Sequence, residues 1–228
     1  MATPQAPVRV RVMFDSADVA AIPLDPTPEM VAWYPYGFPG DIKRFPKETV
    51  IVSIDNDGAH PDCDVLDVET GGATIADIPG WIEEHEKIHD GWKGAIYCDQ
   101  SNLPSVGRVL LKIGKKGTHV WIADWTGQPH VFTGDTFGCV LVATQYQSPQ
   151  SNPASPGQYD LSIVSDPTWH REFDAAPVAQ DVAPVAAAET PDVEAGATTT
   201  GGIVTFVSNG ALAQRAVSSE DLKNWTAT

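Results

Sequence analysis

The chain has 228 residues, and its 14 basic and 30 acidic residues give it a formal net charge of −16. A protein this acidic approaches phosphate groups against its own field, so nucleic acid and anionic membrane surfaces are not expected partners. Its longest apolar runs have the length of strands, so no transmembrane helix is predicted.

Short stretches of apolar, β-branched or aromatic residues recur along the chain, and turn residues separate them. Several of these stretches are continuous rather than alternating, which indicates strands buried on both faces. Helices are predicted at residues 75–89 and 103–113, with another near Glu29, and the connections after Trp125 read as loops. The predicted strands are residues 8–14, 30–36, 49–54, 64–68, 94–98, 119–123, 139–145 and 159–164.

This order of strands and helices predicts an α/β fold, a TIM-like (β/α) barrel whose helices lie mainly in its first half, in a (β/α)5β3-like arrangement. In such a barrel the functional groups gather at the carboxyl ends of the strands. Asp67 and Glu69 end the fourth strand two residues apart, so strand alternation directs both to one side.

Two adjacent carboxylates repel each other, which raises the proton affinity of one of them. That pairing suits a general acid beside an anionic stabiliser, as glycosidic bond cleavage requires. A solvated turn, in which Asp and Glu are common, is the alternative interpretation of the segment.

Acids and aromatic residues also follow nearly all of the remaining predicted strands. Such a groove suits a polysaccharide, because sugar rings stack on aromatic faces and sugar hydroxyls pair with carboxylates. Asp160 lies near the start of the eighth strand. The residues at the other strand ends are Asp15, Tyr36, Asp55, Asp57, Tyr97, Asp99, Asp124, Trp125, Gln145 and Tyr146.

Six short motifs occur in one order along residues 8–166, and their order and spacing resemble those of the glycoside hydrolase family 25 lysozymes. They are also similar to those of the glycoside-hydrolase-like barrel proteins of actinobacteria and their phages. The motifs are Phe14-Asp15-Ser16, Leu66-Asp67-Val68-Glu69, Gly94-Ala95-Ile96-Tyr97, Trp121-Ile122-Ala123-Asp124-Trp125, Ala143-Thr144-Gln145-Tyr146 and Tyr159-Asp160-Leu161-Ser162.

The resemblance implies cleavage of the β-1,4 bond between N-acetylmuramic acid and N-acetylglucosamine in peptidoglycan. By position, Glu69 would be the general acid and Asp67 would stabilise developing positive charge, with Asp15 and Asp160 completing the carboxylate cluster. No cofactor and no metal are expected. The residues expected to bind substrate are Tyr36, Asp55, Tyr97, Trp125 and Gln145.

The chain departs from the family pattern at the first strand, where Met13-Phe14-Asp15-Ser16 replaces Gly-x-Asp-x-Ser, and again at residues 35–40. A catalytically inactive barrel that serves as a sugar-binding or structural component of a virion or cell surface is therefore the second hypothesis.

Two metal patterns also occur. His85, Glu86 and His89 match the HExxH zinc-peptidase pattern, which would make the protein a zinc hydrolase, but no third His follows at metzincin spacing. This motif also falls on a predicted outer helix. The acidic loop that begins at Asp55 resembles a calcium loop, but its twelfth residue is Leu66 rather than an acid.

The composition divides the chain into three parts: a barrel at residues 1–170, an Ala- and Pro-rich linker at 171–202 and a small docking element at 203–228. The last part reads as a strand and turn at 203–210 and a short helix at 218–225. We expect it to dock on the barrel, on a sister chain or on a larger assembly, because so short a piece cannot form a stable domain by itself.

The first residues lack the apolar segment of a signal peptide. With the resemblance, this suggests a phage lysin (endolysin) made in the host cytoplasm and released by a holin, or a virion-associated protein. The three cysteines, Cys63, Cys98 and Cys139, read as buried apolar residues rather than as a disulfide framework.

Overall fold

The computed structural model describes residues 11–38, 40–149, 158–166 and 169–170, together with the backbone of two strands at 202–208 and 211–217. The chain forms two compact units, residues 1–176 and 177–228. Among the described residues, no helix is long and apolar enough to cross a membrane.

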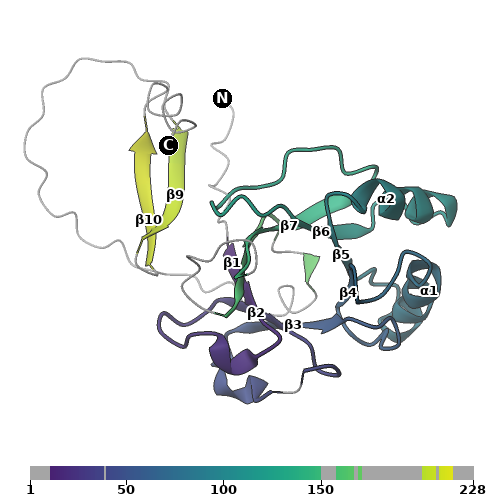
Figure 1. Ribbon diagram of the computed structural model, residues 1–228, viewed down its shortest axis with the longest axis horizontal. Helices are drawn as coiled ribbons and strands as arrows, with labels where there is room; N and C mark the ends of the chain where they lie inside the picture. Colours follow the sequence, from purple (N-terminus) through teal and green to yellow (C-terminus); the bar gives the residue numbers. More distant parts are fainter. Residues whose placement is uncertain are drawn as a thin grey trace, which may run out of the picture. The chain divides into compact units, whose positions relative to one another are not determined.

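The first unit is a closed barrel of eight strands that follow one another around the ring in chain order (Figure 1). Strands β1 to β7 pair in parallel, whereas β8 runs antiparallel to both β7 and β1 and closes the ring. The predicted barrel of eight strands is confirmed. The strands are β1 (Arg11–Asp15), β2 (Met30–Trp33), β3 (Val50–Asp55), β4 (Val65–Val68), β5 (Ala95–Asp99), β6 (His119–Ala123), β7 (Val140–Gln147) and β8 (Asp160–Val164).

The described part of the chain contains two α-helices, α1 (Ile78–Ile88) between β4 and β5 and α2 (Leu103–Lys112) between β5 and β6. Both helices were predicted. The prediction of a helix near Glu29 is wrong, because strand β2 begins at the next residue. The β1–β2 connection instead holds the short 3-10 helix Val19–Ala21, and a second one, Ile42–Arg44, lies between β2 and β3. Pro23, Pro26 and Pro28 explain the missing helix, since proline lacks the N–H that a helix interior needs.

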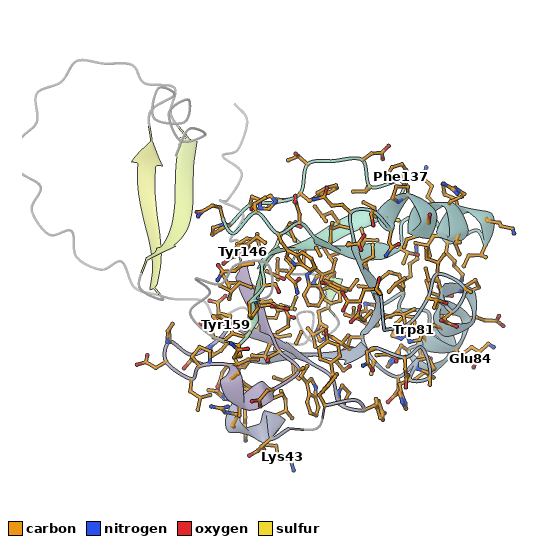
Figure 2. The ribbon with its side chains drawn as sticks, viewed as in Figure 1. Lys43, Trp81, Glu84, Phe137, Tyr146 and Tyr159 are labelled. Atoms are coloured by element: carbon orange, nitrogen blue, oxygen red, sulfur yellow. The ribbon has the colours of Figure 1, made fainter. Side chains whose placement is uncertain are left out.

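The helices cover one side of the barrel through apolar residues at helical spacing. In α1 the buried residues are Ile78, Trp81, Ile82 and His85, which recur at intervals of three and four. Figure 2 shows Trp81 on the side of α1 that faces the strands and Glu84 on the opposite side. Side chains along β4 alternate between the two faces of the sheet. Leu66 packs toward these helices, whereas its neighbours Val65 and Asp67 point into the barrel.

The interior of the barrel is filled by side chains, with Met13, Met30, Val52, Val65 and Trp121 among its buried residues. Its amino-terminal end is covered by Trp92 and by Trp169, whose carbonyl accepts a hydrogen bond of 3.0 Å from the Trp92 indole N–H. The His170 Nε2 atom also lies here, 3.4 Å from the carboxylate of Asp64, the residue before β4. This end is therefore closed, and the opposite end carries the strand ends that were predicted to be functional.

In the second unit, β9 (Gly202–Ser208) and β10 (Ala211–Val217) form an antiparallel two-stranded sheet. The strand predicted within 203–210 corresponds to β9, the turn predicted after it lies outside the described residues, and β10 was not predicted. The expected helix at 218–225 and the expected linker up to residue 201 lie outside the described residues.

Two helical glycines make a matched test of packing between α2 and the loop before β7. A Cβ at Gly107 would lie 2.5 Å from the Cβ of Phe137, whereas nothing lies within 4 Å of a Cβ at Gly80 in α1. Phe137 lies beside α2 in Figure 2 and has a positive φ of 51°. It therefore has little freedom to move away.

We predict that Gly107→Ala lowers the free energy of unfolding by about 1–2 kcal/mol, since overpacking outweighs the better helix propensity of alanine. Gly80→Ala should raise it by up to about 1 kcal/mol. Urea denaturation of both variants checks this, and a stabilised Gly107→Ala variant would show that the α2 contact is looser than described.

Candidate functional site

A pocket of about 460 Å³ opens at the carboxyl-terminal end of the barrel strands. Its walls come from the ends of β1, β2 and β4 and from the start of β8, elements that are far apart in sequence. The carboxyl ends of parallel strands meet at one end of a barrel, which is why these residues converge. The pocket is lined by Asp15, Ser16, Ala17, Asp18, Tyr34, Phe38, Asn56, Asp67, Glu69, Thr70, Gly71, Gly72, Pro149, Gln158, Tyr159 and Asp160.

All four residues predicted as the carboxylate cluster line this pocket. The antiparallel pairing of β1 with β8 sets Asp15 directly opposite Asp160. Asp67 follows the inward-facing Val65 by two residues, so it also points into the barrel. Glu69 lies two residues further on, at the pocket rim, where its side chain is exposed.

Gln145 on β7 joins the acids to two aromatic residues. Its amide Nε2 donates to Asp15 at 3.3 and 3.4 Å and to Asp160 at 3.3 Å. Its Oε1 accepts from the Tyr97 hydroxyl at 2.9 Å and from the Trp125 indole N–H at 2.6 Å. Because both donors meet Oε1, the amide can only present its NH₂ group to the two carboxyls. Gln145 is thus a positioning residue for the Asp15–Asp160 pair.

Asp67 is only 3% exposed. Its Oδ2 accepts a long hydrogen bond of 3.4 Å from Tyr34, and within the described residues its Oδ1 has no hydrogen-bond partner. Burial, followed by the negative charge of Glu69, raises the pKa of Asp67 to about 8. Asp67 therefore holds a proton at neutral pH, which differs from the anionic role expected from its position.

The other three acids have raised pKa values as well. Burial and then the charge of Asp160 raise the pKa of Asp15 well above its usual range. Burial raises the pKa of Asp160 to about 6. Partial burial and then the charge of Asp99 raise the pKa of Glu69. A carboxyl group whose pKa is raised is better suited to act as a general acid, and this gives the pocket a chemical capability.

Of the residues predicted to bind substrate, Tyr97 and Gln145 lie behind the acids, buried, and support them. Trp125 is 47% exposed and reaches the site through its hydrogen bond to Gln145, but it does not line the pocket. Tyr36 lies outside the pocket, where its hydroxyl donates to Asp62 and its ring stacks on His60 at 3.6 Å.

Asp55 also lies outside the pocket, because it turns toward the loop that follows β3. Its carboxylate accepts hydrogen bonds from the backbone N–H groups of Asp57, Gly58 and His60 and from the Trp81 indole. All of these bonds are 2.8–3.0 Å long. Its role is to order this loop and anchor α1, so the prediction that Asp55 binds substrate is not supported by its position.

Several pocket residues were missed by sequence reasoning. Tyr34 follows the inward-facing Ala32 by two positions, so alternation along β2 could have identified it. Asn56, Phe38 and Tyr159 reach the pocket from loops and carry no comparable signal.

The HExxH motif packs as part of α1. The His85 ring stacks on Trp81 with 4.6 Å between ring centroids, and its Nδ1 lies 2.7 Å from the carbonyl oxygen of Pro61. Glu86 forms an ion pair with Lys115. Across the described residues, no group of three or more His, Cys, Asp or Glu side chains could hold a metal ion. The three cysteines are buried and free, as predicted.

Comparison with protein-family models, with curated proteins and with solved structures gives no match to this chain. The assignment of a function therefore depends on the geometry of the pocket and on the motifs in the sequence.

We predict that the stability of the protein falls between pH 5 and pH 8, and that Asp67→Asn reduces this fall. Because the folded-state pKa of Asp67 is raised to about 8, its stabilising contribution is full below its ordinary value and is lost as the pH rises toward 8. The expected fall in Tm is about 5 °C or more, since about 1 kcal/mol shifts Tm by about 2–4 °C in a protein of this size.

Calorimetry at several pH values measures this fall, with Glu48→Gln, an exposed acid before β3, as the control. Equal pH slopes in the wild type and Asp67→Asn would mean that Asp67 is ionised in the folded protein.

Proposed function

We propose that the protein is a peptidoglycan hydrolase of the muramidase type, which cleaves β-1,4 glycosidic bonds in cell-wall glycan. The observation that carries the proposal is the convergence of Asp15, Asp67, Glu69 and Asp160 on one pocket of about 460 Å³. Glycoside hydrolysis needs one protonated and one ionised carboxyl on either side of a sugar linkage, and a pocket of this size holds a sugar ring with its neighbours.

The proposed roles follow from burial. Glu69, at the exposed rim, is the general acid that protonates the leaving oxygen, since it is the acid with access to a glycan entering from solvent. Asp67 faces the reacting ring from below, and in its ionised form it stabilises the positive charge that develops there. Gln145 keeps Asp15 and Asp160 in place beneath them.

The fold agrees with this proposal at a coarse level. We propose that the barrel is a reduced (β/α)5β3-like form of the family 25 architecture, in which most crossover helices have shortened to loops or 3-10 turns. The biological setting that fits such an enzyme is a phage lysin or a virion-associated protein acting on the cell wall.

A second candidate function is a non-enzymatic, sugar-binding component of a virion or cell surface. The separate unit that contains β9 and β10 favours it, because an isolated two-stranded sheet is at best marginally stable and gains stability in an assembly. Binding to the wall without bond cleavage would support this candidate.

We predict that the protein releases reducing sugar from purified cell walls and that Glu69→Gln lowers the rate by about 100-fold or more, the range typical for loss of a general acid. Glu48→Gln makes the same chemical change at an exposed position on the opposite end of the barrel and should keep full activity. A turbidity assay with the same two variants gives an independent measure.

Unchanged activity in Glu69→Gln would remove Glu69 from the mechanism. No sugar release by the wild type, with intact wall binding, would replace the hydrolase by the sugar-binding candidate.

A further inference from the structure

We propose that Trp125 is a positioning residue for the proposed reaction, because its indole N–H sets which end of the Gln145 amide faces the buried pair of acids. The pair is Asp15 and Asp160, which stand opposite each other on β1 and β8. The inference deepens the proposed function and rests on it for one premise, that this pair takes part in glycan cleavage.

The Gln145 side chain is 2% exposed and lies between two sets of polar groups. On one side, its Oε1 is 2.6 Å from the Trp125 indole nitrogen and 2.9 Å from the Tyr97 hydroxyl. On the other side, its Nε2 lies 3.3 Å from carboxyl oxygens of both Asp15 and Asp160. A carbonyl oxygen has two lone pairs, so Oε1 is fully occupied and the NH₂ group is left for the acids.

The two groups at Oε1 are not equivalent. A tyrosine hydroxyl donates or accepts, so Tyr97 would satisfy either end of the amide. The carboxyl groups are equally permissive, since a protonated carboxyl donates and an ionised one accepts. An indole N–H can only donate. Among the described partners of the Gln145 side chain, Trp125 is therefore the one that tolerates a single orientation of the amide.

The backbone holds Trp125 in place for this role. The Asp124 N–H donates to the Gln145 carbonyl at 2.9 Å, and the Gly127 N–H donates to the Tyr146 carbonyl at 2.8 Å. The loop is thus fastened to β7 on both sides of Trp125. The side chain itself is 47% exposed, so a change there disturbs little of the core.

The orientation of the amide decides which charge state of the acids is favoured. Burial and the charge of Asp160 raise the pKa of Asp15, and the hydrogen bond from Gln145 opposes them. An NH₂ group donates to carboxylates and so favours ionisation. A turned amide would present its oxygen, which accepts from a protonated carboxyl and favours the protonated form. Loss of the Trp125 donor should therefore raise the proton affinity of the pair.

The other titratable groups around the pair are left in place when Trp125 is replaced. On the loop of Trp125, His130 and Asp124 pair at 2.8 Å. The groups that act on the pair from other strands, or share the pocket wall with it, are Asp18, Tyr34, Asp67, Glu69, Tyr97 and Tyr159.

A carbon-detected NMR titration of the carboxyl groups in the full chain tests the inference. The pKa of Asp160 is about 6 in the wild type. Trp125→Phe keeps an aromatic ring but removes the donor, and we expect it to raise this pKa by about 0.5 or more, because a contact that favours the ionised form is lost. Tyr97→Phe leaves the indole donor in place and should raise it by less.

Gln145→Met separates the route through the amide from any direct effect of the indole. In this background Trp125→Phe should change the pKa of Asp160 by no more than about 0.2, because there is no amide to turn. Trp92→Phe is the matched control. It removes an indole donor whose acceptor is the Trp169 carbonyl at the closed end of the barrel, and it should leave the titration of Asp160 unchanged.

An unchanged pKa of Asp160 in Trp125→Phe would overturn the inference, as would an equal or larger rise in Tyr97→Phe. Equal effects of Trp125→Phe with and without the Gln145 amide would also overturn it. If Gln145→Met does not fold, the comparison of Trp125→Phe with Tyr97→Phe still decides.

The proposed function is tested separately by glycan cleavage. If the wild type does not cleave wall glycan while the titrations behave as expected, the hydrolase is lost and the orienting role of Trp125 stands. If glycan is cleaved and the titration of Asp160 ignores Trp125, the hydrolase stands and this inference is wrong.

Discussion

The antiparallel return of β8 between β7 and β1 is the constraint from which the rest of the site follows. It closes a barrel that is otherwise parallel, and its register sets Asp160 across from Asp15. Two buried acids in that position cannot both ionise cheaply, so the pair needs a donor that does not carry charge. Gln145, on the neighbouring strand β7, supplies it through its NH₂ group.

The barrel interior supports this arrangement from below. The Trp121 indole donates to the Ser162 hydroxyl at 3.0 Å, and Ser162 is paired in register with both Met13 and Gln145. The polar layer of acids and Gln145 therefore lies on a packed layer of large side chains, which exclude water from one side of each carboxyl. This burial is the first cause of the raised pKa values of Asp15, Asp67 and Asp160. Burial of these carboxyl groups costs folding stability. The raised proton affinity that results is the property that the proposed chemistry of the pocket uses.

Sequence patterns predicted the strands well, because continuous β-branched and apolar runs such as those of β3 and β7 have one simple interpretation, a largely buried strand. Alternation along β4 was sufficient to place Asp67 and Glu69 together. The errors arose where the chain leaves regular structure. Asp55 ends a strand as the other acids do, yet the following loop folds back and uses its carboxylate for three backbone N–H groups and the Trp81 indole. Local hydrogen bonding of this kind has no periodic signature, and the same is true of the loops that carry Asn56 and Phe38 into the pocket.

The central claim is that acids at the barrel mouth have raised pKa values and meet a glycan there, and a carbon-detected NMR titration of the carboxyl groups tests it most directly. The account predicts that Asp160 titrates near pH 6 and Asp67 near pH 8, and that both resonances shift when a β-1,4-linked chito-oligosaccharide is added. Titration of every carboxyl group below pH 5, with no change on addition of the oligosaccharide, would contradict it.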